Sequence, residues 1–176
     1  MKEKNNKKIY IILSFTGTIL SRAVRVCTKD EYCHVSLSLD KDLNKMYSFG
    51  RINPYIPFIG GLVHESPKWG TFKRFKNTKA RIVSVDVTEE QYDKIKNLLE
   101  SMYDNKKEYS FNVLGLVAVK FNKKFQRKNH FYCAEFVKYL MDQAEINVDL
   151  PEIIKPQDFT TVSSDIIYQG LLKQYN

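Results

Sequence analysis

Apolar and polar residues alternate from His34 to Leu39, a pattern typical of a strand with one buried face. A later segment has a different period, because the apolar residues that follow Cys133 recur three and four positions apart: Phe136, Val137, Leu140 and Met141. That spacing places them on one side of a helix. We therefore expect a strand at 34–39 and a helix at about 134–144.

The same patterns predict the other elements of a mixed domain. Strands are expected at 10–15, 45–50, 72–75 and 80–87, and a short helix at 19–26. Thr88 and Gln91 are spaced as a capping box, so another helix is expected to begin there. No repeat divides the chain, and 176 residues suit one core, so a single domain at 1–176 is expected.

The segment 51–69 combines prolines and glycines with several aromatic residues: Pro54, Tyr55, Pro57, Phe58, Gly60, Gly61, Pro67 and Trp69. It is too rich in turn-forming residues for a plain strand and too aromatic for a disordered linker. We expect either a flap over a cleft or a packed surface loop. The apolar C-terminal segment at 166–172 is expected to pack across the domain.

Cys133 stands where an extended segment is expected to turn into a helix, and this position suits a nucleophile. Backbone N–H groups at a helix start carry partial positive charge, which favours the thiolate and can stabilise an oxyanion. A buried cysteine at such a place also occurs as a small apolar residue. His34 opens a strand with small neighbours, so it is the candidate general base.

A catalytic imidazole needs a third polar group to orient it. Ser48 lies on the strand expected to pair with the histidine strand, and Glu65 or His64 could serve instead if their loop folds back. A zinc site built from Cys33, His34, His130 and Cys133 is an alternative, since these residues could supply four ligands. Adjacent residues on a strand point to opposite faces, so we expect no metal and no cofactor.

A strand that opens His-Val-Ser-Leu-Ser-Leu, followed much later by Tyr-Cys-Ala-Glu-Phe-Val, resembles the circularly permuted branch of the papain-like cysteine hydrolases. Its relatives include NlpC-type cell-wall amidases and lecithin retinol acyltransferase. The resemblance covers about 10–159. It implies an α+β fold, with an antiparallel sheet or barrel packed against helices, and the order of histidine strand before cysteine helix that marks the permuted branch.

The same resemblance implies cleavage of an amide or ester through a thioester, with Cys133 as nucleophile and His34 as base. The family's third residue, a His, Glu or other polar group, lies on the strand after the histidine, where this chain has Ser48. Weaker candidates for substrate or oxyanion contact are Ser21, Arg22, Glu65, Tyr109 and Glu135. Glu135 could instead only complement the helix dipole. The weak third group leaves open a binding module of the same fold with little catalysis.

A net charge of +8 and a pI near 9.3 imply attraction to anionic partners such as lipid headgroups, cell-wall polymers or nucleic acid. No nucleic-acid motif accompanies the charge, so nucleic acid is the second alternative only. The segment 109–128 is read as a helix with an apolar stripe and a basic end. It could rest on an anionic surface, or it could be an ordinary core helix with a solvated end.

Three cysteines, Cys27, Cys33 and Cys133, are an odd number in a chain large enough not to need disulfides, which favours a cytoplasmic setting. Cys27 and Cys33 are read as structural. The basic N-terminus and the apolar stretch 9–20 could pass for a signal peptide, but polar residues interrupt that stretch. No run is long enough to span a bilayer, so at most peripheral membrane contact is expected.

Overall fold

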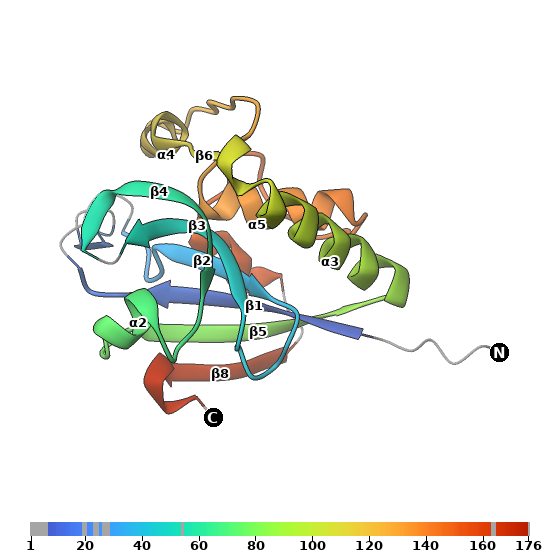
Figure 1. The fold of residues 1–176 in the computed structure, drawn as a ribbon, viewed down its shortest axis with the longest axis horizontal. Coiled ribbons are helices and arrows are strands. Elements are labelled where there is room, and N and C mark those ends of the chain that lie inside the picture. The colour runs from blue at the N-terminus through green and yellow to red at the C-terminus, as the bar shows by residue number, and fades with distance from the viewer. Residues whose placement is uncertain are drawn as a thin grey trace.

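A six-stranded antiparallel sheet forms the main layer of the part of the chain that is described, in the order β4-β3-β2-β1-β5-β8 (Figure 1). The structure is a computed structural model that describes residues 7–18, 21–22, 25, 29–53, 55–162 and 165–175. The strands are β1 (Lys7–Phe15), β2 (His34–Ser38), β3 (Met46–Asn53), β4 (Ile56–Glu65), β5 (Lys79–Val87) and β8 (Asp165–Leu171). The fold is therefore α+β with a mostly antiparallel sheet, as the sequence predicts at this coarse level.

The helices that matter most for the site lie over one side of this sheet (Figure 1). They are α3 (Glu89–Asp104) and α5 (Cys133–Gln143), and α5 packs against β2 and β3. The five-residue helix α2 (Gly70–Arg74) contacts β3 and β4. A short parallel pair, β6 (Ser110–Phe111) and β7 (His130–Phe131), flanks α4 (Val113–Lys120) in the sequence. Short 3-10 turns lie at Lys106–Glu108 (η1), Pro156–Thr161 (η2) and Leu172–Gln174 (η3).

The central strand β1 is apolar on both faces, because both are covered. One face contributes Ile9, Ile11 and Leu13 to the core that α3 and α5 complete. The other face contributes Tyr10 and Ile12 to a smaller cluster, which also contains Met46, Phe72, Ile82 and Leu172. Burying one such side chain contributes about 1.5–3 kcal/mol, so this strand anchors both layers.

The predicted strands at 10–15, 34–39, 45–50 and 80–87 are confirmed as β1, β2, β3 and β5. The predicted capping box is also present: Thr88 Oγ1 accepts from Gln91 N–H at 3.2 Å, and Gln91 Oε1 accepts from Thr88 N–H at 3.0 Å. The helix after the cysteine is confirmed as α5. The C-terminal apolar segment forms β8, an edge strand beside β5.

Two expectations between β3 and β5 were wrong. The segment 51–69 is not a plain loop, since it holds the ten-residue strand β4, which pairs with β3. β4 is at the edge of the sheet, where a proline or glycine costs little because, among the described residues, one side of the strand is not hydrogen-bonded to another strand of this sheet. The expected strand at 72–75 is helical instead and lies largely in α2, whose Phe72 enters the smaller cluster.

The expected long helix at 109–128 is also shorter than predicted. Only α4 is helical, because Asn112 caps its start by accepting from Gly115 N–H at 2.9 Å. Its end is marked by Asn122, which has a positive φ of 52°. Of the helix expected at 19–26, only Ser21, Arg22 and Arg25 are described, and these three are helical. Cys27 lies outside the described residues.

Candidate active site

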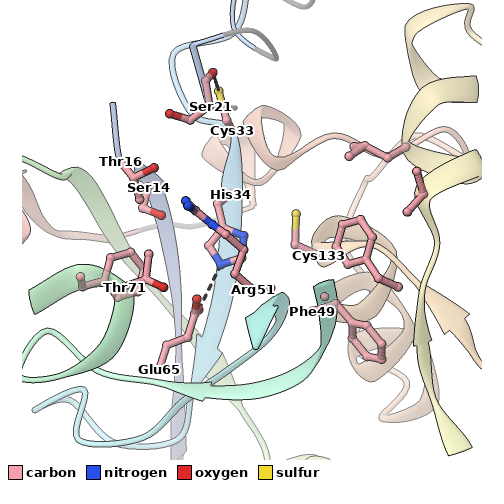
Figure 2. A pocket seen from close by; sticks show the side chains of 16 residues that line it. Ser14, Thr16, Ser21, Cys33, His34, Phe49, Arg51, Glu65, Thr71 and Cys133 are labelled. Carbon is pink, nitrogen blue, oxygen red and sulfur yellow. Dashed lines mark hydrogen bonds and ion pairs between the residues drawn. The ribbon is translucent and has the colours of Figure 1, made fainter. Parts of the chain in front are cut away.

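His34 and Cys133 line the same cavity, which has a volume of about 340 Å³ (Figure 2). His34 is the first residue of β2, and its backbone is opposite Ser14 near the end of β1. Cys133 is the first residue of α5. The packing of α5 against β2 and β3 fixes the position of this residue relative to the sheet. Two residues 99 positions apart in sequence therefore meet because a strand and a helix begin at the same end of the sheet.

Glu65 is the carboxylate that contacts the imidazole, and Ser36 Oγ lies 3.4 Å from the same ring nitrogen, Nε2. Glu65 Oε2 lies 3.0 Å from Nε2 of His34, and the two side chains are 9% and 20% exposed. The same oxygen accepts hydrogen bonds from Ser36 Oγ and Ser48 Oγ, each at 2.7 Å. Figure 2 shows the imidazole between the Glu65 carboxylate and the Cys133 sulfur.

The strand register explains why Glu65 reaches this place. The backbone of Glu65, at the end of β4, is opposite Met46 on β3, two residues before Ser48. Ser48 therefore donates to Glu65 rather than to the imidazole, and the group beside the imidazole is the carboxylate that the sequence offered as an alternative. Glu65 lies at the end of the paired strand β4, not in a loop that folds back over the site. His64, the other alternative, stacks on Tyr103 with ring centroids 3.8 Å apart.

The charges of this cluster favour an ion pair between Glu65 and His34. Burial by itself lowers the pKa of His34, but the Glu65 charge and the interactions with Cys133 outweigh it and raise that pKa to about 10. Burial raises the pKa of Glu65, whereas the His34 charge and the hydrogen bonds from His34, Ser36 and Ser48 lower it, with a net fall. The raised pKa means that the imidazole of His34 is protonated near neutral pH.

Cys133 is 5% exposed, and its position at the first turn of α5 is fixed by the residue before it. The Tyr132 hydroxyl donates to Ile154 C=O at 2.8 Å, and Tyr132 N–H donates to Glu135 Oε2 at 3.2 Å. The N–H groups of a first helical turn have no carbonyl partner within their own helix. The N–H of Cys133 itself is one of them, and such groups can stabilise negative charge on an oxygen bound at the start of the helix.

The rest of the cavity is mostly apolar and comes from several elements. Its apolar side chains include Phe49, Phe72, Phe111, Val113 and Leu116. Its polar lining residues include Ser14, Thr16, Ser21, Arg51 and Thr71 (Figure 2). Sequence reasoning named Ser21 among the candidates for substrate contact but missed the apolar members, which come from four separate elements and share no motif.

A second thiol, Cys33, lines the same cavity. Its Sγ donates to Ser21 C=O at 3.4 Å. Burial, reinforced by the charge of Asp30, raises the pKa of Cys33 to about 11. A thiol with so high a pKa is a poor nucleophile near neutrality, so Cys33 is an internal reference for Cys133.

The remaining sequence candidates lie elsewhere. Tyr109 lines a neighbouring hollow, which it shares with Tyr103 and Lys107, rather than the Cys133 cavity. Glu135 is 9% exposed and its Oε2 also accepts from Asn112 Nδ2 at 3.2 Å, so it joins the start of α4 to the start of α5. Arg22 is exposed and does not line the cavity.

Among the residues with a described position, no three His, Cys, Asp or Glu side chains gather into a set that could hold a metal ion. His130, a member of the zinc set weighed in the sequence, has its Nδ1 2.7 Å from Lys128 C=O. Within the described part of the chain, none of the helices has the length and apolar character needed to cross a bilayer. Comparisons with protein-family models, curated proteins and solved structures found no match.

Proposed function

We propose that this protein is a cysteine-dependent hydrolase or acyltransferase that cleaves an amide or ester bond through a thioester. The observation that carries the proposal is the chain of contacts from Glu65 through His34 to the cavity that Cys133 lines. A nucleophile, a base and a carboxylate that orients the base are the parts that such chemistry needs.

In the resting site the proton of the Cys133 thiol is held by His34, so that a thiolate faces an imidazolium whose charge the Glu65 carboxylate stabilises. The thiolate attacks the substrate carbonyl, whose oxygen becomes negative and is stabilised by N–H groups at the start of α5. His34 returns its proton to the leaving amine or alcohol as the carbon–heteroatom bond breaks. The product of this half-reaction is a thioester on Cys133.

Water completes the cycle as a hydrolase. His34 takes a proton from the water as its oxygen attacks the thioester, and then returns that proton to the Cys133 sulfur as the carboxylic acid leaves. An amine or alcohol in place of water would make the enzyme a transferase. The apolar lining of the cavity, from Phe49, Phe72, Phe111 and Leu116, suits an acyl group with a substantial hydrocarbon part.

The proposal includes a permuted papain-like fold. It is supported by the order of the elements, since the strand that bears His34 precedes the helix that begins at Cys133. It is also supported by the antiparallel pairing of β2 with β3 and by the packing of α5 on both strands.

The test is a search for the acyl-enzyme. The protein is mixed with p-nitrophenyl acetate, butyrate or octanoate, and nitrophenolate release is followed together with the intact mass. We expect a burst equal to the protein concentration and a mass gain of one acyl group that peptide mapping assigns to Cys133. Cys33→Ala should keep both signals and Cys133→Ala should lose both. Equal release from Cys133→Ala would refute the proposal and favour a binding module.

A further inference from the structure

The helix α4 exposes its apolar side chains to solvent. Val113, Leu114, Val117 and Phe121 are 53%, 54%, 52% and 65% exposed. At about 100° per residue these positions fall within one side of the helix, roughly 100° wide, and Phe121 caps its C-terminal end. Gly115 and Val119, on the opposite side, are buried. The apolar stripe therefore faces away from the protein.

This stripe continues into a basic segment. The exposed cationic residues of that segment are Lys120, Lys123, Lys124, Arg127 and Lys128. Phe125, 42% exposed, lies among them. No Asp or Glu occurs from 109 to 134, and Lys124 pairs with Glu152 at 2.9 Å across the surface. Apolar side chains and net positive charge thus share one surface, which we call the α4 surface (residues 113–128).

The α4 surface adjoins the cavity of Cys133. Val113 belongs to both, since it is half exposed and also lines the cavity. Leu116, three residues further along α4, lines the cavity as well. Figure 1 shows α4 at the end of the molecule away from β8 and the C-terminus. Two further exposed aliphatic residues, Ile52 and Ile59, belong to the β3–β4 hairpin, and β4 contacts β6 just before α4.

We propose that the α4 surface docks on an anionic lipid bilayer, with the apolar stripe at the boundary of headgroups and acyl chains. Charge complementarity selects this occupant, because basic residues beside an exposed apolar helix face are what an anionic interface binds. A nucleic acid would pair with the lysines and leave Leu114 and Val117 in water. Docking would turn the mouth of the cavity toward the lipid. The proposal does not depend on the chemistry of Cys133.

The experiment measures co-sedimentation of the full chain with vesicles of phosphatidylcholine alone or mixed with phosphatidylglycerol. Leu114→Gln/Val117→Gln removes the apolar stripe, and Lys120→Glu/Lys123→Glu reverses part of the charge. The matched controls are Ile166→Gln, on an exposed apolar residue of β8, and Lys41→Glu/Lys173→Glu, on exposed lysines outside the α4 surface. Circular dichroism verifies that each variant is folded.

We expect the wild type to bind the anionic vesicles at least about tenfold more tightly than the neutral ones, and to weaken as salt rises above about 0.1 M. Each α4 variant should lose at least about tenfold in partitioning, because one replaces two apolar side chains of the stripe and the other reverses the charge of two basic residues. The controls should stay within about twofold of the wild type. Failure of the wild type to bind either vesicle, or equal losses in variants and controls, would overturn the proposal. Binding to duplex DNA but not to vesicles would assign the surface to nucleic acid instead.

Discussion

Glu65 Oε2 lies 3.0 Å from His34 Nε2, and hydrogen bonds from Ser36 and Ser48 at 2.7 Å hold the carboxylate in that position. A carboxylate that binds Nε2–H fixes the tautomer of the imidazole and leaves Nδ1 to exchange a proton with another group. Cys133 lies on the other side of the ring (Figure 2). The orientation of the candidate base thus depends on one buried carboxylate from the edge strand β4.

Replacing this carboxylate should remove most of the reactivity. Glu65→Gln keeps the shape but cannot stabilise the imidazolium, so we expect thioester formation to slow by roughly 10²- to 10⁴-fold. Ser48→Ala removes one donor to Glu65 and should cost less than about tenfold in rate and about 1 kcal/mol in stability. Single-turnover release of nitrophenolate gives both rates. Equal losses in the two variants would show that Ser48 acts directly.

The ion pair also predicts how stability depends on pH. Because the folded pKa of His34 is raised from 6.5 to about 10, its contribution is complete below pH 6.5 and is lost as pH rises toward 10. Because the pKa of Glu65 is lowered from 4.5, its contribution is complete above pH 4.5 and is lost as pH falls through the lowered pKa. Both contributions are complete only between these two ordinary values.

Urea unfolding of wild type and Glu65→Gln checks this. The excess stability of the wild type should be largest at about pH 5.5 and smaller by at least about 1 kcal/mol at about pH 10. Any cost of Gln that does not depend on pH cancels in this comparison. An excess that is constant, or that grows with pH, would mean that the pair is not ionised in the folded protein.

Gly50 is predicted to leave space for the cluster. A Cβ at this position would lie 3.1 Å from Ser48 Oγ, 3.2 Å from Glu65 Oε1 and 3.4 Å from His34 Cε1, and hydrogen bonds restrain all three groups. We expect Gly50→Ala to slow acylation of Cys133 by about tenfold or more while the protein still folds. Gly61→Ala is the control, because its Cβ would meet only the flexible end of Ile52, at 3.2 Å. Equal rates in the two variants would contradict the role given to Gly50.

Glu135 is expected to stabilise the fold rather than take part in the chemistry. Glu135→Ala removes the acceptor of Tyr132 N–H and Asn112 Nδ2 and should lower the free energy of unfolding by about 1–3 kcal/mol. Glu135→Gln keeps an acceptor oxygen and should lose less than half of that. Both variants should acylate Cys133 at rates close to wild type once folded. A selective loss of rate in Glu135→Gln, with stability intact, would assign it a catalytic role.

Periodicity made the scaffold of the site predictable. Strict alternation from His34 and helical spacing after Cys133 marked the two elements that bear the candidate base and nucleophile. The partner of His34 was not decided in the same way, because Pro57, Gly60 and Gly61 concealed β4 and left Glu65 in an apparent loop. An edge strand tolerates such residues, and composition alone does not reveal that a strand is at an edge.

The surface of α4 shows a second limit. Apolar spacing in 109–128 indicated a helix. It did not indicate which side of that helix packs against the rest of the protein, because exposed and buried apolar residues look alike in a sequence. The prediction of one helix over 109–128 also included Phe111, which lies in β6, and Phe125, which lies in the irregular segment after α4. Only the cap at Asn112 and the positive φ at Asn122 limit the helix to eight residues.

The most direct test of the site is the pH dependence of iodoacetamide alkylation at Cys133 and Cys33, followed by mass spectrometry in wild type and in His34→Ala. If His34 and Cys133 act as a pair, Cys133 reacts well below pH 7, Cys33 reacts only toward its pKa of about 11, and the replacement of His34 removes the early reactivity of Cys133 alone. If Cys133 alkylates no faster than Cys33, or equally fast without His34, the two residues do not form a nucleophile and base.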